Sequence, residues 1–541
     1  MPGKSYAETV KAFDWAQVRA ALGWTSDAPV SLGHAIVDRH AASGRPALIS
    51  IAEDGSEQRL SYAELATHSD RFAAVLQALG VRPGDRVAGL MPRRPETLIV
   101  IIGTLKAGAI YVPIFTGFGL DAVDYRLQHS GSEFLVTHHR VRSQVRPQTA
   151  TRIICVSDSR EGLANGDLDF WSLMMARTEI PVPVARRRDD PAAIIYTSGS
   201  TGQPKGGVIA VNFLAAVWPY IVYGLDLKPD DVFWPTGDPG WGYGFVCYLG
   251  ALAMGATVIS LEPNPSPQTL LSILGQYRVT NLATTPTMLR SLMSMGEHAV
   301  HSTEVRLRAI SSCGEPLNAK VVEFFHDASG IWPMDHYGAT EYALPIGNHN
   351  AIDMTVKPGS MGLPAPGFRM TILGEDGAEL PAGQIGLIGK RMNTDCLYWM
   401  RYWNDAEASR ELVRNGWIIA GDLGRRDDDG YFWFEGRAGD MIKSAGYRIG
   451  PFEVESALLK HPAVAEAAVV GKPDELRGEI VKAFIVLRPG VVGHDKLAQE
   501  LVAFAKETVG GHQAPRAIEF VDALPKTETG KIQRFVLRER A

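Results

Sequence analysis

A run of small, hydroxylated and basic residues between Tyr196 and Gly206 has the composition of a polyphosphate-binding loop. It reads Tyr-Thr-Ser-Gly-Ser-Thr-Gly-Gln-Pro-Lys-Gly. Gly199 and Gly202 let backbone N–H groups approach an anion without obstruction by a Cβ atom. Lys205 adds a positive charge that complements phosphate oxygens. Four hydroxyl groups add neutral donors, and they belong to Thr197, Ser198, Ser200 and Thr201.

This loop is not a Walker A motif, which requires Gly, four residues and then Gly-Lys-Ser/Thr. That spacing does not occur in the chain, and Gly530-Lys531 also fails because Ile532 follows it. The alternative is a flexible Ser/Gly-rich loop without a ligand. So long a run of this composition after an apolar strand, expected from Ala192 to Tyr196, disfavours that alternative.

The elements that must position the loop show a weak internal repeat. Val81-Arg-Pro-Gly-Asp-Arg-Val87 resembles Leu227-Lys-Pro-Asp-Asp-Val232, and each is followed by an apolar stretch. Each stretch ends in Gly-Ala and an expected strand, at 108–112 and 255–259. Two similar doubly wound α/β layers are the natural interpretation. The alternative is coincidence, because Pro-Asp turns and Gly-Ala helix ends are common.

The pattern changes in the last third of the chain. From about residue 360, short strands alternate with Gly and Pro and predict a small β-rich subdomain, with strands at 370–373, 386–389, 417–420 and 431–434. After Gly436, helices at 452–460 and 496–509 and strands at 464–470 and 481–487 predict a separate α+β domain. We therefore expect an N-terminal domain over 1–436, a hinge over 437–440 and a C-terminal domain over 441–541.

Bulk properties narrow the class of protein. The chain has 541 residues, too many for one core, and a formal net charge of −6, which argues against a general nucleic-acid binder. Its four cysteines are far apart and form no CxxC pair, so neither a disulfide framework nor a zinc site is expected. The first residues lack an apolar signal core, and we expect a cytoplasmic protein.

One uncharged stretch, Trp241 to Ile259, has about the length of a membrane span. Gly255 interrupts it, and Ala256 to Leu261 then has the composition of a strand. We therefore expect a buried helix followed by a buried strand rather than a transmembrane helix.

Beyond the loop, the sequence resembles the acyl-adenylate-forming superfamily of AMP-binding enzymes, which includes acyl-CoA synthetases, luciferases and the adenylation domains of peptide synthetases. Motifs typical of that family occur in the family order along nearly the whole chain. They are Gly314-Glu-Pro316, Tyr337-Gly-Ala-Thr-Glu341, Gly421-Asp422, Gly436-Arg437, Lys443-Ser-Ala-Gly-Tyr-Arg448 and Pro525-Lys-Thr-Glu-Thr-Gly-Lys531. The similarity is closest to short- and medium-chain acyl-CoA synthetases, including acetyl-CoA synthetase-like proteins, notably at 446–455 and 529–534.

The resemblance implies a fold and a reaction. The fold would be α/β, with a large N-terminal domain of two doubly wound α/β subdomains plus a small β-rich subdomain, followed by a mobile small α+β C-terminal domain. The reaction would join a small carboxylic acid to coenzyme A, with ATP and CoA as co-substrates, Mg²⁺ as cofactor and an acyl-adenylate as intermediate. Both reactants of the first step are anions, so fixed cations and a metal must offset their repulsion.

The resemblance also implies site residues. Glu341 and Thr201 would hold Mg²⁺, Thr340 would bind the α-phosphate, and Lys531 would bridge the attacking carboxylate and the α-phosphate. Tyr337 would stack on adenine, and Asp422 would accept the ribose hydroxyls. The nucleotide site would comprise Thr197, Ser198, Gly199, Ser200, Thr201, Gly202, Lys205, Gly314, Glu315, Pro316, Asp335, His336, Tyr337, Gly338, Ala339, Thr340, Asp422 and Arg437.

Thioester formation would use a second arrangement of the same domains. In the family, the C-terminal domain rotates, Lys531 leaves the site, and a loop corresponding to Ala445 and Gly446 arrives together with Arg448. The chain departs from the family pattern at the hinge, where Gly439-Asp440 stands in place of Asp-Asp or a lysine. Glycine can absorb a large backbone change, so we expect the rotation to survive.

The acyl pocket is expected to involve Trp241, Tyr243, Cys313 and Gly338, although core packing would explain the first three equally well. Acetate-specific relatives carry a tryptophan where this chain has Gly338, so we predict acids longer than acetate. Tyr243 can refill part of that space and keep the limit short. No basic residue is placed at the pocket, which favours a monocarboxylic acid.

Three functions remain open from the sequence. The first is a CoA ligase for a short- to medium-chain fatty acid, or one specific for acetate or propionate. The second is a freestanding adenylation enzyme that loads a carrier protein. The third is a catalytically silent scaffold, which the retained Lys531 and Glu341 disfavour. A protein lysine acetyltransferase and deacetylase acting on Lys531 would be further partners.

Overall fold

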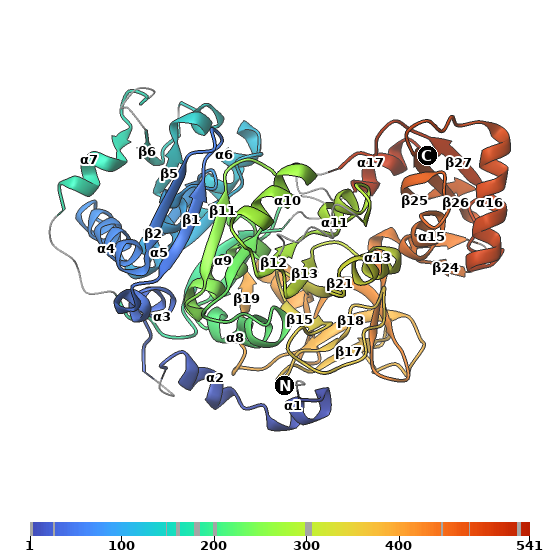
Figure 1. The fold of residues 1–541 in the computed structure, drawn as a ribbon, viewed down its shortest axis with the longest axis horizontal. Coiled ribbons are helices and arrows are strands. Elements are labelled where there is room, and N and C mark those ends of the chain that lie inside the picture. Colours follow the sequence, from blue (N-terminus) through green and yellow to red (C-terminus); the bar gives the residue numbers. More distant parts are fainter. Residues whose placement is uncertain are drawn as a thin grey trace.

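The structure is a computed structural model that describes residues 4–24, 28–147, 149–157, 163–177, 184–197, 203–297, 306–444, 447–474, 476–526 and 532–541, with the side chains of 447 and 448 left aside. Two large sheets form the body of the protein, and a smaller lobe built from the C-terminal residues lies at one end (Figure 1). The expected α/β fold with a separate C-terminal α+β unit is confirmed.

The first large sheet has eight strands, and its inner strands are buried. Their order is β19 (Trp399–Tyr402), β9 (Gly206–Ala210), β8 (Pro191–Tyr196), β4 (Ile110–Ile114), β3 (Arg86–Leu90), β5 (Phe134–His138), β6 (Arg152–Val156) and β7 (Leu168–Asp169). Strands β8 to β7 in this order are parallel to their neighbours. The strands β8, β9 and β19 at the other edge pair antiparallel.

The second large sheet has nine strands. Their order is β16 (Leu363–Pro364), β15 (Ala343–Gly347), β14 (Pro333–Ala339), β13 (Ala309–Cys313), β12 (Asn281–Thr284), β10 (Val232–Pro235), β11 (Thr257–Leu261), β1 (Pro46–Ile51) and β2 (Glu57–Ser61). The six strands from β14 to β1 in this order are parallel to their neighbours. Their carboxyl ends therefore meet at one edge, which is where ligands bind in open α/β sheets.

The predicted repeat appears as two equivalent strand–helix–strand units. In the first unit, β3, α5 (Pro95–Lys106) and β4 follow one another, and β3 pairs parallel with β4. In the second unit, β10, α9 (Gly242–Met254) and β11 do the same. Every residue of α5 is buried, as is nearly all of α9. The repeat is not complete, because β1 and β2, from the beginning of the chain, extend the second sheet rather than the first.

Further helices cover the sheets, and their starts follow the sequence. Ser61 caps α4 (Tyr62–Ala78) and forms a capping box with Glu64, whereas α5, α10 (Pro267–Gln276) and α11 (Pro286–Met293) begin with proline. The other helical segments are α1 (Tyr6–Ala12), α2 (Trp15–Ala21), α3 (Leu32–Ile36), α6 (Leu120–Ser130), α7 (Phe170–Met175), α8 (Phe213–Pro219), α13 (Ala319–Ser329), α14 (Ala406–Glu411), η1 (Asp38–Ser43), η2 (His139–Gln144) and the π-helical turn η3 (Tyr220–Gly224).

The uncharged stretch from 241 to 259 folds as the sequence indicates. Helix α9 ends at Gly255, which adopts a left-handed conformation with φ of +88°, and strand β11 follows. Within the described ranges, no helix combines the length and the apolar character that a membrane crossing requires.

The predicted β-rich subdomain is a five-stranded antiparallel sheet. It comprises β17 (Met370–Leu373), β18 (Gly386–Arg391), β20 (Val413–Arg414), β21 (Trp417–Arg426) and β22 (Phe432–Arg437). All four predicted strands of this region are present, and β21 is longer than expected. Strand β19 lies within the same stretch of chain but joins the first large sheet by pairing with β9.

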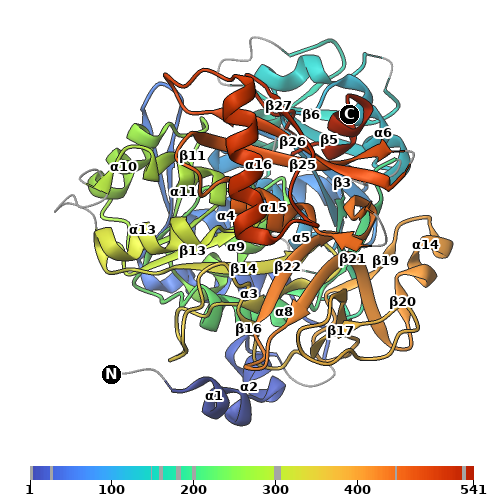
Figure 2. The same ribbon diagram turned by 90° about the vertical axis from the view of Figure 1, so that its right-hand side faces the viewer.

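The C-terminal lobe has a five-stranded sheet of its own. Its elements are β23 (Ile442–Ser444), β24 (Tyr447–Ile449), α15 (Pro451–Leu458), β25 (Val464–Asp474), β26 (Gly478–Leu487), α16 (Asp495–Val509), β27 (Ala517–Phe520) and α17 (Arg534–Glu539). Figure 2 shows this lobe from its outer side, with α16 and α15 in front of the large sheets. Apolar side chains of α15, α16, β25 and β26 form its main core.

The segment between the two lobes is a short 3₁₀ turn, η4 (Ala438–Asp440). Helix α17 holds this turn. Arg538 donates a hydrogen bond from Nη1 to the carbonyl oxygen of Gly439 at 2.9 Å and forms an ion pair with Asp440. Arg534 lies near the same carboxylate and pairs with Glu455 of α15 at 2.7 Å. The predicted hinge is thus tied to the C-terminal lobe in this conformation.

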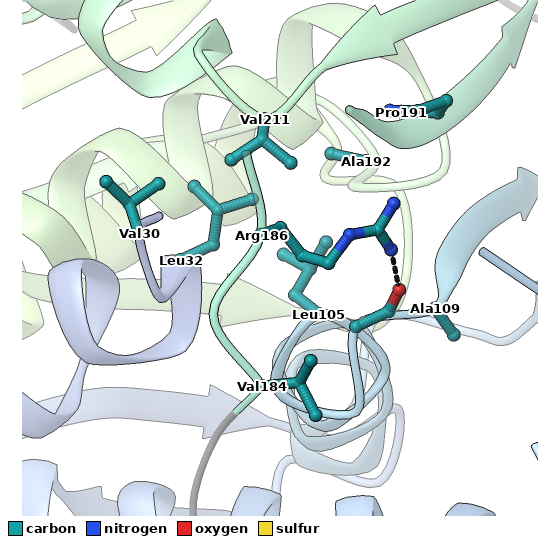
Figure 3. Close-up of a pocket in the computed structure, with 10 residues that line it drawn as sticks. Val30, Leu32, Leu105, Ala109, Val184, Arg186, Pro191, Ala192 and Val211 are labelled. Atoms are coloured by element: carbon teal, nitrogen blue, oxygen red, sulfur yellow. Dashed lines mark hydrogen bonds between the residues drawn. The ribbon is translucent and has the colours of Figure 1, made fainter. Parts of the chain in front are cut away.

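A small cavity of about 10 Å³ lies where the N-terminal segment joins the first sheet (Figure 3). Val30 and Arg186 form an antiparallel bridge beside it, with N···O distances of 2.7 and 2.8 Å. The Arg186 guanidinium donates a hydrogen bond to the carbonyl oxygen of Gly108. The other lining side chains are mostly apolar, and the volume is close to that of one water molecule. The cavity therefore belongs to the packing of this segment.

A buried ion-pair cluster stabilises the N-terminal part. The fully buried Lys106 ammonium of α5 contacts Asp38 at 2.5 Å and Asp70 at 2.7 Å. Because Asp70→Ala leaves this ammonium with one carboxylate, we expect it to lower the free energy of unfolding by about 3 kcal/mol. Urea denaturation followed by tryptophan fluorescence measures the change. The matched variant Asp189→Ala removes an exposed carboxylate and should cost less than about 0.5 kcal/mol. Equal midpoints for the two variants would contradict the prediction.

Candidate active site

The described ends of the glycine-rich loop lie on two adjacent antiparallel strands. Strand β8 ends at Tyr196 and β9 begins at Gly206, and these two residues are paired. Thr197 donates its backbone N–H to the carbonyl oxygen of Lys205 at 2.9 Å. The Tyr125 hydroxyl of α6 donates to the carbonyl oxygen of Pro204 at 2.9 Å. The described residues on either side of the loop are therefore held together by β8–β9 pairing and by α6, and we call these flanking residues the phosphate hairpin. Five of the loop's predicted site residues lie outside the described residues: Ser198, Gly199, Ser200, Thr201 and Gly202.

The motif Tyr337 to Glu341 lies beside this hairpin, although the two are more than a hundred residues apart in sequence. It occupies the end of β14 and the turn into β15. A Cβ atom at Gly207 of β9 would lie 3.0 Å from Cγ2 of Thr340. The absence of a side chain at Gly207 thus allows Thr340 to approach the phosphate hairpin closely. Thr340 and Ala339 are partly exposed, as a ligand-facing edge requires.

Glu341 is a buried carboxylate with a defined partner. Tyr402, the last residue of β19, donates its hydroxyl to Oε1 of Glu341 at 2.5 Å. Burial raises the pKa of Glu341, and the hydrogen bond from Tyr402 lowers it. Lys205 lies over the Tyr402 ring, with Nζ 5.3 Å from the centroid. The Lys205 ammonium and the Glu341 carboxylate therefore both lie beside the Tyr402 side chain.

The predicted nucleotide residues form a second connected group. The Tyr337 hydroxyl donates to Oδ2 of Asp422 at 2.7 Å, and Nε of Arg437 lies 3.1 Å from Oδ1. Asp422 and Arg437 are paired residues on β21 and β22. Burial and the neighbouring Asp422 carboxylate raise the pKa of Tyr337 well above its usual value, so its hydroxyl stays protonated. Oδ2 of Asp422 accepts from Tyr337, whereas the buried Oδ1 accepts no hydrogen bond from the described residues and can accept one from a sugar hydroxyl.

The Gly-Glu-Pro motif follows β13. Gly314 adopts φ of +101°, and an added Cβ would meet no atom within 4 Å among the described residues, so open space lies beside it. Glu315 is turned toward α11, where its carboxylate accepts hydrogen bonds from the Thr287 hydroxyl at 2.8 and 2.9 Å and pairs with Arg290 at 2.7 Å. The motif can therefore line the nucleotide site through its backbone and Pro316, while the Glu315 carboxylate fixes its position.

Asp335 and His336 occupy buried positions of β14. Burial raises the pKa of Asp335 well above its usual range, which favours the neutral form of this carboxyl. Burial lowers the pKa of His336 to about 3, so its imidazole is neutral. This part of the site is thus uncharged, in contrast to the Asp422 and Arg437 side.

Trp241, Tyr243 and Cys313 lie close to these neutral groups. Tyr243 is in the first turn of α9 and its hydroxyl lies 3.1 Å from that of Tyr220. Trp241 packs against Phe115 at a centroid distance of 5.5 Å, and its buried indole N–H has no hydrogen-bond partner among the described residues. Cys313 ends β13 and is buried. Tyr243 and Trp241 are partly exposed, so they can contact a ligand.

Gly338 does not leave the open volume that the sequence suggested. A Cβ atom there would lie 2.1 Å from the carbonyl oxygen of Ala343 and 2.9 Å from Cδ2 of Leu344. The β14–β15 pairing has an irregularity between Tyr337 and Ala339, and Ala343 adopts a positive φ of 65°. The hairpin backbone therefore fills the space that the missing indole would occupy. A tryptophan cannot be placed at Gly338 without moving this backbone, and the effect of Gly338 on the length of acid accepted stays a prediction.

The described residues fit one way of holding Mg²⁺. They contain no group of three acidic, histidine or cysteine side chains that could hold a metal by themselves. Mg²⁺ is usually bound by one or two carboxylates, waters and substrate phosphates. Glu341 matches that pattern because it is a buried carboxylate beside the phosphate hairpin. The second predicted ligand, Thr201, lies outside the described residues.

The predicted residues of the C-terminal lobe can be placed only in part. Lys531, Ala445 and Gly446 lie outside the described residues, and Arg448 is described only by its backbone in β24. Gly439 lies in η4, where an added Cβ would meet no described atom within 4 Å.

Two residues of the site were missed by the sequence analysis. Tyr402 lies at the end of a short strand, and nothing near it in sequence marks it as the partner of Glu341. Tyr220 lies in an apolar run, where its type alone indicates core packing. The one local signal was Pro219, because a proline at that position favours irregular helix geometry.

The arrangement suits chemistry between two anions. A hairpin with a lysine, a buried carboxylate that can hold a divalent cation and a carboxylate for a sugar surround one edge of the second sheet. A group of neutral side chains, Tyr243, Tyr220 and His336, lies next to them. Such a site can hold a nucleotide triphosphate with its phosphates toward the hairpin and place an uncharged organic chain beside the α-phosphate.

Comparisons with known proteins agree with this geometry. Residues 37–391 match the model of the AMP-binding enzyme family, and residues 453–531 match that of the AMP-binding enzyme C-terminal domain. The chain is 35% identical to the acetyl-coenzyme A synthetase of Bacillus subtilis, over 99% of this chain and 95% of that protein. It is 36% identical to the mitochondrial acyl-coenzyme A synthetase ACSM3 of Mus musculus, over 92% and 86%.

A solved structure extends the agreement to the fold. The crystal structure of a Brucella canis acyl-CoA synthetase superposes with a TM-score of 0.80 at 38% identity, covering 99% of both chains. The site geometry, the two matching family models and these full-length similarities lead to one conclusion: the chain belongs to the AMP-binding enzyme family.

Proposed function

We propose that the protein is an ATP-dependent acyl-CoA synthetase. It converts a carboxylic acid, ATP and CoA into acyl-CoA, AMP and pyrophosphate through an acyl-adenylate. The observation that carries the proposal is the convergence of the phosphate hairpin, the Glu341–Tyr402 pair and the Asp422–Arg437 pair on one sheet edge. The relatives named acetyl- and acyl-coenzyme A synthetases support CoA as the acceptor.

In the first step, a carboxylate oxygen of the acid attacks the α-phosphorus of ATP and the bond to pyrophosphate breaks. Thr340 donates a hydrogen bond to the α-phosphate, and Lys205 neutralises charge on the outer phosphates. Glu341 would hold Mg²⁺, which when bound would supply positive charge to offset that of the phosphate oxygens. Asp422 accepts hydrogen bonds from the ribose hydroxyls, and this positions the α-phosphate next to the carboxylate of the acid.

In the second step, the thiol sulfur of CoA attacks the acyl carbon and AMP leaves. We infer that the C-terminal domain, residues 441–541, rotates about residues 437–440 between the two steps, relative to a domain formed by residues 1–436. Lys531 serves adenylate formation, and Ala445, Gly446 and Arg448 serve the thiol step. The short turn η4, held by Arg538, is a pivot of suitable length.

The acid is a short- to medium-chain monocarboxylic acid. The residues next to the adenylate site on the Tyr243 side are neutral, because burial keeps His336 deprotonated and Tyr243 protonated. Among the described residues, His336, Tyr220 and Tyr243 offer no cationic partner to a second carboxylate on the substrate. Acetylation of Lys531 by a protein acetyltransferase would remove the charge needed for the first step and would give a means of regulation.

A panel of acids tests the function. With Mg²⁺, ATP and CoA, we expect AMP release with short- and medium-chain acids, from acetate through decanoate, and weaker release with dicarboxylic acids. The reason is the neutral lining of the acyl side. Coupled measurement of AMP and of the acyl-CoA product by mass spectrometry identifies the acceptor. If no acid supports pyrophosphate–ATP exchange, the proposed function is wrong, and transfer to a carrier protein but not to CoA would change the acceptor.

Lys531→Ala separates the two steps. Because the ammonium is needed where two anions meet, we expect adenylate formation to fall by at least about 100-fold. Thioester formation from a supplied acyl-adenylate and CoA should be unchanged. Lys526→Ala, in the same segment but paired with Glu466 at 2.5 Å, is the matched control and should retain both steps. Equal loss of both steps in Lys531→Ala would refute the rotation.

Tyr402→Phe tests the ionisation state of the Glu341 carboxyl group. The Tyr402 hydroxyl lowers the pKa of Glu341, which burial raises, so its removal raises that pKa further. If the ionised carboxylate is required, activity is lost as pH falls through this pKa. We therefore expect the acidic limb of the kcat/KM profile to move to higher pH, and the Mg²⁺ requirement to increase. Tyr277→Phe removes a similar tyrosine–carboxylate bond, to Glu57 at 2.9 Å on the surface, and should leave the profile in place.

A further inference from the structure

Three side chains form a continuous hydrogen-bond chain from the acyl side into the core. The Tyr243 hydroxyl lies 3.1 Å from the Tyr220 hydroxyl, and Tyr220 lies 3.3 Å from Nδ1 of His336. Nε2 of His336 lies 2.9 Å from the carbonyl oxygen of Asn348. Tyr220 and His336 are buried, whereas Tyr243 is partly exposed. The nucleotide and thiol steps described above use none of these bonds.

The direction of every hydrogen bond in this chain is determined at its buried end. A backbone carbonyl can only accept, so Nε2 of His336 carries the proton. The imidazole is neutral because burial lowers its pKa to about 3, and Nδ1 is therefore an acceptor. Tyr220 then donates to Nδ1, and the Tyr220 oxygen accepts from the Tyr243 hydroxyl. The Tyr243 hydroxyl thus donates its only proton to Tyr220, inside the protein.

The surroundings hold the chain in place. Tyr220 begins the π-helical turn η3, in which Leu225 donates to the Tyr220 carbonyl at 2.8 Å, and π-helical turns are frequent at functional sites. A Cβ atom at Gly224 would lie 2.6 Å from the Tyr220 ring, and one at Gly347 would lie 2.6 Å from Cδ2 of His336. Two glycines therefore make room for the two rings.

Two thiols are competing partners near the Tyr243 hydroxyl, those of Cys247 and Cys313. Cys247 follows one turn later on α9, and burial raises the pKa of its thiol well above the usual value. A neutral thiol is a weak acceptor compared with a phenolic oxygen. The Tyr243 proton therefore stays on the bond to Tyr220, and the Tyr243 oxygen offers a ligand only lone pairs.

We propose that Tyr243 selects acids that carry a hydrogen-bond donor, a hydroxyl or amino group, at the position on the acyl chain that reaches its oxygen. This inference rests on the proposed function and deepens it by naming a substrate class. A methyl group at that position leaves the Tyr243 oxygen without a partner. A carbonyl or carboxylate oxygen there faces another acceptor and is disfavoured further.

Matched acids test the selection in the native protein. We use series of straight-chain acids of equal length that end in a hydroxyl, a methyl or a methyl ketone group, and measure pyrophosphate–ATP exchange. At the preferred length, kcat/KM should be about tenfold higher for the hydroxy acid than for its methyl analogue, with the keto acid lowest. Equal values for the three acids at every length would overturn the proposal.

Two variants separate selection from a structural effect. Tyr243→Phe removes the acceptor, so the advantage of the hydroxy acid should disappear while the methyl analogue is retained. Tyr220→Phe removes the partner of the Tyr243 proton, so Tyr243 can donate to a ligand and the keto acid should gain about tenfold relative to the methyl acid. Tyr248→Phe, on the same helix with its hydroxyl 3.2 Å from Ser260, is the matched control and should keep the native order.

The outcomes distinguish this inference from the function on which it rests. If the native protein catalyses exchange with some acids but Tyr220→Phe ranks the acids in the same order, the selection by Tyr243 is overturned. The synthetase function then stays intact. A uniform loss for all acids in both variants would mean that the chain only supports packing, which also overturns it. No exchange with any acid in the native protein overturns both proposals.

Discussion

The bond between Tyr402 and Glu341 joins the parts on which the site depends. Tyr402 ends an edge strand of the first sheet, and that strand pairs with β9, one side of the phosphate hairpin. Glu341 follows the last residues of β14 in the second sheet. One short contact at 2.5 Å therefore fixes the hairpin against the carboxylate motif.

The site is divided into a charged side and a neutral side. On the charged side, a bound nucleotide and metal would offset the charges of four residues: Asp422, Arg437, Glu341 and Lys205. On the acyl side, burial keeps His336 and the tyrosines uncharged. This separation follows from solvation, because an ionised group beside an apolar chain would lack both water and a partner. Selectivity on that side then depends on hydrogen-bond direction and shape.

Much of the fold could be predicted from the sequence, because the sequence signals for its elements are local. The strand before the glycine-rich loop, the β-rich subdomain and the elements of the C-terminal lobe are each encoded within a few residues, and the structure confirms their positions. The partners of Glu341 and Tyr243 could not be predicted, because Tyr402 and Tyr220 reach them through tertiary packing. The surroundings of Gly338 could not be predicted for a related reason: the backbone of Ala343, five residues later, approaches it closely through the hairpin.

The last helix of the chain has a mechanical consequence. Arg538 and Arg534 of α17 bind the turn at Gly439 and Asp440, so the pivot between the lobes is anchored by residues only a few positions from Ala541. Fusions, affinity tags or proteolytic trimming at this end would therefore act on the turn about which we propose that the C-terminal domain rotates.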